Sequence, residues 1–104
     1  MLTVRSNLRV TLQPAQVVAD LGKSAEFFCS INGDSPSSVS ISWMKDGVTI
    51  RSGSVGGRIR FMGQTRMQVL RVAREDQGMY QCFAKNDYET AQQSAQLVLG
   101  GEQT

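Results

Sequence analysis

The side chains that could carry chemistry in this sequence are few, because its 104 residues include two cysteines and no histidine. Two cysteines without histidine cannot complete the closed four-ligand shell of a structural zinc ion. The commonest general base is also missing, so Ser–His–Asp triads and Cys–His dyads cannot be built. The carboxylates Glu75, Asp76, Asp87 and Glu89 do not follow a calcium-loop spacing. We therefore expect no catalytic residue, no metal and no cofactor.

The two cysteines stand in a specific pattern. The residues that define it are Cys29, Trp43 and the run Asp-x-Gly-x-Tyr-x-Cys formed by Asp76, Gly78, Tyr80 and Cys82. Each has a mechanical role in an immunoglobulin-type sandwich: the cysteines join two sheets, the tryptophan packs against the bridge, and the tyrosine hydroxyl bonds to backbone near the start of its strand. The alternative is a pair of free thiols, as in an intracellular muscle-type domain of the same fold. A matched pair on facing core strands favours the disulfide and an oxidising compartment.

The elements that must position these residues are short extended runs broken by turn residues. We expect strands at 8–12, 16–19, 25–31, 39–45, 48–50, 58–62, 66–72, 78–85 and 91–99. Pro14 is expected to end the first strand or move the chain to another sheet edge, and Asp46-Gly47 predicts a hairpin. The prediction is an all-β, I-set immunoglobulin-like sandwich of two antiparallel sheets joined by one disulfide.

Composition narrows the class of protein further. Hydrophobic residues make up 40% and charged residues 19%, as in ordinary soluble domains. The net charge of +2 is too small to indicate nucleic-acid binding. The N-terminus lacks the features of a signal peptide, and no apolar stretch approaches the roughly 20 residues of a membrane helix. The chain is therefore expected to be either cytosolic or a piece of a longer secreted protein.

Several segments resemble one immunoglobulin domain of the Dscam (Down syndrome cell adhesion molecule) family: 42–47, 78–83, 86–87 and 94–101. The resemblance implies an extracellular domain of a membrane-anchored receptor, whose anchor lies outside this sequence and which mediates homophilic cell recognition. The implied partners are the same receptor on an apposed cell or neighbouring immunoglobulin domains. It also implies a domain at 7–99, the end of a preceding domain or linker at 1–6, and a linker to a next domain at 100–104. The alternatives are an intracellular muscle-type structural module and a domain of another, heterophilic receptor.

Strand parity predicts which side chains face outward. If Trp43 and Cys82 point into the core, then Met44, Phe83 and Val98 point out of one sheet and form a candidate protein-binding patch. Tyr88, near the tip of the last hairpin, is a candidate anchor for recognition. The alternatives are that the three apolar residues are scattered on the surface and that a neighbouring domain covers Tyr88.

The opposite sheet and one edge carry weaker signals. Phe28 and Leu70 are expected to face out of the other sheet and to pack on each other across strands. Four arginines, Arg51, Arg58, Arg60 and Arg66, concentrate positive charge. They indicate either a site for heparan sulfate or an acidic partner, or a structural pair between Asp76 and Arg58 or Arg60 with the others solvated. We favour the structural pair.

Overall fold

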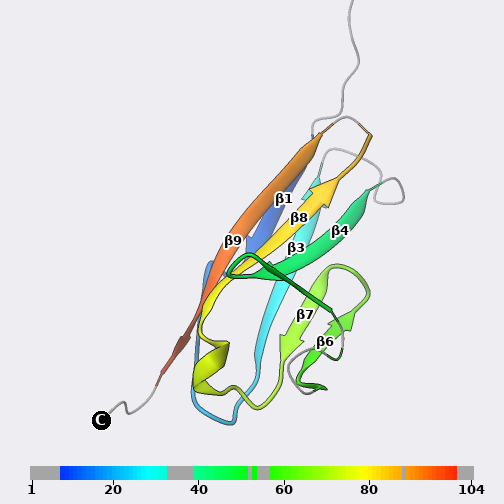
Figure 1. The fold of residues 1–104 in the computed structure, drawn as a ribbon. Coiled ribbons are helices and arrows are strands. Elements are labelled where there is room, and N and C mark those ends of the chain that lie inside the picture. The colour runs from blue at the N-terminus through cyan, green and yellow to red at the C-terminus, as the bar shows by residue number, and fades with distance from the viewer. Residues whose placement is uncertain (1–7, 33–38, 52, 54–56, 88, 101–104) are drawn as a thin grey trace, which may run out of the picture.

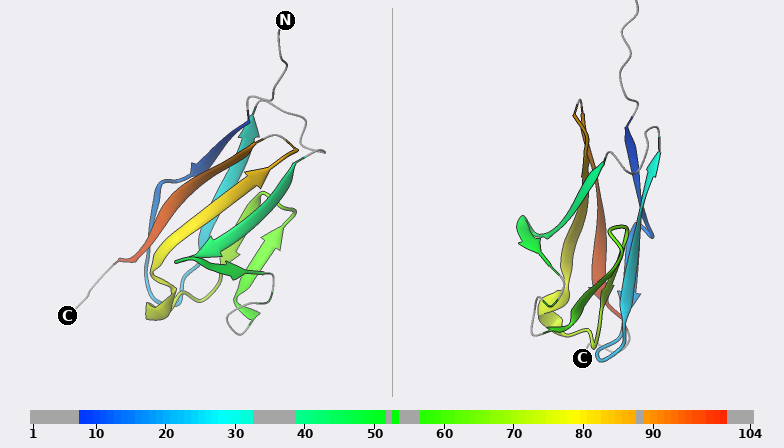
Figure 2. Two further views of the ribbon diagram at one scale, coloured as in Figure 1. Left: turned by 45° about the horizontal axis from the view of Figure 1, so that its top comes forward. Right: turned by 90° about the vertical axis from the view of Figure 1, so that its right-hand side faces the viewer.

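A computed structural model of the chain describes residues 8–32, 39–51, 53, 57–87 and 89–100, which form a two-layer β-sandwich (Figures 1 and 2). The strands are β1 (Arg9–Gln13), β2 (Gln16–Ala19), β3 (Ala25–Asn32), β4 (Ser40–Lys45), β5 (Val48–Ile50), β6 (Ile59–Met62), β7 (Arg66–Val69), β8 (Gly78–Lys85) and β9 (Thr90–Leu99). One sheet has the order β1-β3-β7-β6 and the other β2-β9-β8-β4-β5. The edge-on view in Figure 2 shows the two layers side by side.

The core lies between the two layers because apolar residues alternate with polar ones along the strands. In β8, Tyr80, Cys82 and Ala84 are fully buried while Met79 and Lys85 are exposed. The same period of two in β3 buries Ala25, Phe27 and Cys29. The alternation therefore orients every inner side chain toward the facing sheet.

A disulfide between Cys29 on β3 and Cys82 on β8 joins the layers, which confirms the predicted bridge and fold. The two Cα atoms are 6.4 Å apart. Trp43 is buried and lies directly opposite Cys82 in the pairing of β4 with β8. The cysteines and the tryptophan of the sequence pattern therefore lie together in the core.

The chain changes sheet at Pro14. Before it, β1 pairs antiparallel with β3; after it, β2 pairs parallel with β9 in the other sheet. Proline has no N–H to contribute to a ladder, so a strand is easily interrupted there. The expected shift to another sheet edge is confirmed.

The turn before β8 is held by a buried polar cluster centred on Asp76. The Tyr80 hydroxyl donates to the Asp76 carbonyl oxygen at 2.7 Å, which confirms the expected tyrosine corner. Arg58 donates from Nη1 and Nη2 to the two Asp76 carboxylate oxygens at 2.5 and 3.2 Å. Burial, followed by the nearby Asp76 carboxylate, raises the pKa of Tyr80, so the phenol remains a donor. The expected structural pair is therefore Arg58–Asp76.

Two local expectations were wrong. The strand predicted over 66–72 ends at Val69, because the chain turns at Arg71, where φ is +49°, and the Leu70 and Arg71 carbonyls accept hydrogen bonds from the Arg58 guanidinium. Phe28 does not pack on Leu70, since the pairing of β3 with β7 sets Phe28 opposite Arg66 and leaves Leu70 beyond Gln68. A short 3-10 turn, η2 (Arg74–Asp76), also forms where no helix was expected.

Candidate protein-binding face

The outer face of the five-stranded sheet carries the candidate patch. On β8 the outward residues Met79, Gln81 and Phe83 follow one another at every second position. Gln81 lies directly opposite Met44 on β4, and Phe83 lies one pair further along, opposite Ser42. Met44 and Phe83 are therefore diagonal neighbours on one face, and each is half-buried.

Met79 belongs to the same face and is 42% exposed. Along β8, Met79 and Phe83 lie on either side of Gln81, and Met44 lies opposite Gln81 on β4. The three apolar side chains are therefore neighbours of Gln81. We call these four residues the methionine face. Met79 was not among the predicted patch residues, although the strand parity that selects Phe83 selects Met79 equally.

Val98 lies on the same outer face, on β9 and away from Met44 and Phe83. The parallel pairing of β2 with β9 sets it opposite Val18, which is 63% exposed. Gln96 and Ser94 separate Val98 from the part of β9 that faces Phe83, whose direct partner is Gln92. The structure thus brings Met44 and Phe83 together and separates Val98 from both. Val98 is instead a diagonal neighbour of Met79, whose direct partner on β9 is Gln96. Tyr88, the fourth candidate, lies outside the described residues.

The outer face of this sheet has almost no charge. Its outward residues are Gln16, Val18, Ser40, Ser42, Met44, Thr49, Met79, Gln81, Phe83, Lys85, Thr90, Gln92, Ser94, Gln96 and Val98. Lys85 is the one charged residue among them. Cores of protein interfaces are depleted in charged residues and enriched in methionine and aromatic residues. The face therefore has the composition of a contact surface.

Asp46 fixes the end of this face next to Met79. Its carboxylate accepts the Met79 N–H at 3.0 Å, and its own N–H donates to the Met79 carbonyl at 2.9 Å. The bond from the Met79 N–H, followed by that from Lys45, lowers the pKa of Asp46. Gly78 precedes Met79 with φ +146°, and a Cβ there would lie 2.5 Å from the Asp46 Oδ2. The backbone that carries Met79 is thus held in one position.

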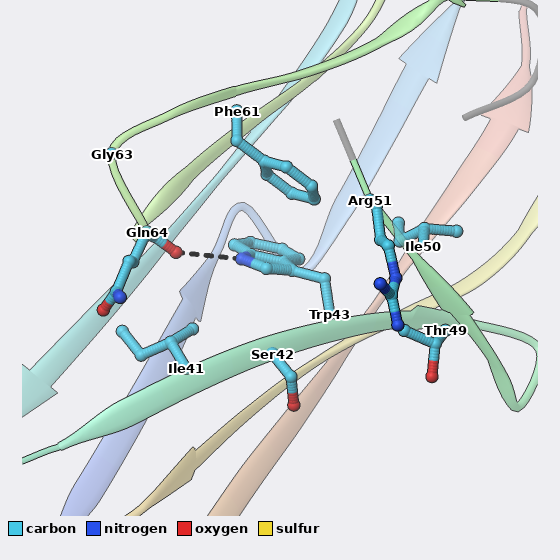
Figure 3. Close-up of a pocket in the computed structure, with 9 residues that line it drawn as sticks. All are labelled: Ile41, Ser42, Trp43, Thr49, Ile50, Arg51, Phe61, Gly63 and Gln64. Atoms are coloured by element: carbon cyan, nitrogen blue, oxygen red, sulfur yellow. Dashed lines mark hydrogen bonds between the residues drawn. The ribbon is translucent and has the colours of Figure 1, made fainter. Parts of the chain in front are cut away.

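A separate hollow of about 380 Å³ opens between the edge strands β5 and β6 (Figure 3). Figure 3 shows the Phe61 ring pointing toward the Trp43 indole, whereas Ser42 and Thr49 point away from it. The indole N–H already donates to the Gln64 carbonyl at 2.9 Å. This donor is therefore satisfied, and among the described residues no buried side-chain nitrogen or oxygen lacks a hydrogen-bond partner.

The four arginines do not form one cluster. Arg58 is engaged with Asp76, and Arg51 lines the hollow. Arg60 and Arg66 project from the outer face of the four-stranded sheet, where they lie opposite Gln68 and opposite Phe28 and Met62, respectively. The structure thus leaves two of the four on a common face.

The two layers, the bridge and the tyrosine corner define an immunoglobulin-type sandwich. The sequence profile described as the immunoglobulin I-set domain matches residues 8–99. The chain belongs to the immunoglobulin I-set domain family.

Within this family, the chain is similar in sequence and structure to domains of cell-surface receptors. The chain is 38% identical over 100 residues to cell adhesion molecule Dscam1 of Drosophila melanogaster, which covers 96% of this chain and 4% of Dscam1. It is 31% identical over 86 residues to netrin receptor DCC of Rattus norvegicus, which covers 83% of this chain and 6% of DCC. The crystal structure of the N-terminal eight Ig domains of DSCAM isoform 1.30.30 matches with a TM-score of 0.74 and 35% identity, covering 92% of this chain and 11% of that one. The resemblance to Dscam immunoglobulin domains is confirmed, and the chain spans a small fraction of these relatives.

No helix among the described residues is long and apolar enough to cross a membrane.

Proposed function

We propose that this domain is a protein-binding module of a cell-adhesion receptor and that it takes part in homophilic recognition through the methionine face. The observation that carries the proposal is the outer sheet face on which Met44, Met79 and Phe83 flank Gln81 and on which Lys85 is the one charged residue among the outward strand residues. A sheet face with partly exposed methionine and aromatic groups and few charges is suited to association with another protein. Its role is binding, and we assign it no catalytic step.

The compartment is inferred from the disulfide. A buried Cys29–Cys82 bridge persists in oxidising environments and is uncommon in the cytosol. Together with the 38% identity to a cell adhesion molecule, it supports an extracellular domain in the ectodomain of a plasma-membrane receptor, anchored through another part of the full-length protein. The same observation disfavours an intracellular muscle-type module.

The domain is proposed to span 7–99, with the end of a preceding domain or linker at 1–6 and a linker to a next domain at 100–104. The first strand, β1, begins at one end of the sandwich, and β9 finishes at the other (Figure 1). Gly100 still donates its N–H to the Ala19 carbonyl at 2.8 Å, which ties the exit of the chain to β2. This end-to-end path also suits a spacer that sets the angle between neighbouring domains.

Bead aggregation separates binding from spacing. The chain is coupled to beads, where many copies on each surface amplify a weak contact. Wild-type beads are expected to aggregate with one another. Phe83→Glu should abolish aggregation, because a carboxylate buried without a partner in an interface costs more than such a contact supplies. Ser30→Glu is the matched control: it adds the same charge at an exposed position of β3 on the other sheet and should leave aggregation intact.

The competing functions give different results in this assay. Equal aggregation by the wild type and Phe83→Glu would contradict the methionine face as the contact. No aggregation by wild-type beads would favour a spacer or a heterophilic receptor domain, the second candidate, which the similarity to netrin receptor DCC supports.

A further inference from the structure

The outer face of the four-stranded sheet carries a second constellation of exposed residues. One row runs across β3, β7 and β6, with Phe28 opposite Arg66 and Arg66 opposite Met62. Phe28 and Met62 are each 42% exposed, and the Arg66 side chain between them is 43% exposed. An aromatic ring, a guanidinium and a methionine therefore lie side by side and open to solvent.

Arg66 is held in place from two sides. Its guanidinium carbon lies 4.8 Å from the centroid of the Phe28 ring, within the range of a cation–π contact. Its Nε donates to the Glu26 carboxylate two positions along β3. Within the described residues, neither terminal nitrogen of Arg66 makes a hydrogen bond. The N–H groups of both remain available to an external acceptor.

The charges of this face favour an acidic partner. Its outward residues are Arg9, Thr11, Gln13, Glu26, Phe28, Ser30, Asn32, Arg60, Met62, Arg66 and Gln68. Three of the four charged residues in that set are cationic, and the one anion, Glu26, is already paired with Arg66. Two such faces would oppose cations with cations. The four residues of the methionine face include no carboxylate, and the Asp46 carboxylate at the end of that face already accepts from the Met79 N–H and from Lys45. Another copy of this sandwich thus has no complementary sheet face.

We propose that Arg66, flanked by Phe28 and Met62, is a docking site for a different protein that presents a carboxylate beside an apolar side chain. The carboxylate accepts hydrogen bonds from the two terminal nitrogens, a geometry that arginine favours. The apolar neighbour covers Phe28 and Met62. Because Phe28 and Glu26 already restrain Arg66, little side-chain entropy remains to be lost on binding. Arginine and aromatic residues are typical of the few positions that dominate binding energy.

The test uses a library of random 12-residue peptides displayed on phage, selected on the immobilised chain. Enriched peptides are expected to contain Asp or Glu next to an aromatic or aliphatic residue. Arg66→Gln should weaken their binding by about tenfold or more, the loss that follows removal of one charge-assisted pair. Arg9→Gln is the matched control, since it removes the same charge from an exposed position of the same face and should leave binding within about twofold. Thermal unfolding verifies that both variants are folded.

Four results would overturn the proposal. They are enriched peptides without a carboxylate, equal binding to wild type and Arg66→Gln, retention on heparin that depends on Arg66 while no peptide is enriched, and self-association that Arg66→Gln abolishes. The proposal is independent of the homophilic function. Arg66→Gln should leave bead aggregation unchanged, and Phe83→Glu should leave peptide binding unchanged, so either proposal can fail without the other.

Discussion

The two outer faces of this sandwich differ in chemistry although the inner faces follow one rule. The five-stranded sheet presents glutamine, serine and threonine around Met44, Met79 and Phe83, with Lys85 as its charged residue. The four-stranded sheet presents an arginine stacked on Phe28 and paired with Glu26. Inside, both sheets contribute apolar residues to one core. The inner side chains are constrained by packing, whereas the outer ones are free to specify partners.

The largest effect on stability is expected from removal of the disulfide that joins the two sheets. The double variant Cys29→Ala/Cys82→Ala should lower the free energy of unfolding by about 4 kcal/mol, because the bridge closes a long loop in the unfolded chain. Urea denaturation measures this change. Hydrogen exchange should show both sheets losing protection together. That result would show that the two sheets unfold as one cooperative unit although their outer faces differ. Loss of protection in one sheet alone would contradict it.

A substitution at Gly78 should disturb the methionine face more than the outer face of the four-stranded sheet. Gly78→Ala introduces a Cβ against the Asp46 carboxylate at φ +146°, and should cost about 1–3 kcal/mol of stability. Gly47→Ala is the control, since φ is +86° there but no atom lies within 4 Å of the added Cβ. Amide NMR shifts should move around Met79 in Gly78→Ala and remain small around Phe28. Equal losses of stability in the two variants would show that the contact with Asp46 is unimportant.

The outer face of the four-stranded sheet, which carries Arg66, should respond to salt, and the methionine face should not. Glu26→Gln removes the partner of Arg66 and should cost about 0–1 kcal/mol, since both side chains are partly exposed. The difference from wild type should shrink as salt screens the pair. Gln81→Ala on the uncharged face serves as the comparison, and its cost should not depend on salt. Urea denaturation at low and high ionic strength decides the matter, and a salt-independent Glu26→Gln cost would contradict the pair.

The smallest effect is the pH response of Asp46. Because its pKa is lowered in the folded chain from the usual 3.8, its contribution to stability is present above pH 3.8 and is lost as the pH falls through the lower folded value. Asp46→Asn should therefore flatten the decline of the unfolding midpoint below pH 3.8. Thermal unfolding of both proteins from neutral to strongly acidic pH measures the difference. Parallel curves would show that the bond to the Met79 N–H does not stabilise the ionised carboxylate.

Much of the fold could be predicted because its determinants are local or covalent. Alternation identifies the inner face of a strand from its own residues, and it correctly oriented Trp43, Tyr80 and Cys82. Pro14 marked the change of sheet and Asp46-Gly47 the hairpin because both act through their own backbone geometry. The strand was predicted to run too far because the alternation continues to Val72, past Arg71, where φ is +49° and the chain turns.

The arrangement of the faces was not predictable in the same way. Parity states which way Val98 points, but the pairing partners of β9 decide that it lies beside Val18 and away from Phe83. Likewise, Phe28 was assigned to the correct face and to the wrong neighbour, because which residue of β7 lies opposite it depends on the alignment of two strands that are far apart in sequence.

The sequence by itself determined the class of this protein: a disulfide-linked sandwich, its core residues and the outward parity of its strands. These follow from side-chain type and a period of two, which each strand carries within itself. Only the tertiary structure decided that Met44 lies opposite Gln81, between Met79 and Phe83, and that Arg66 lies between Phe28 and Met62. Such neighbours are set by strand register, and register is fixed by the packing of the whole core.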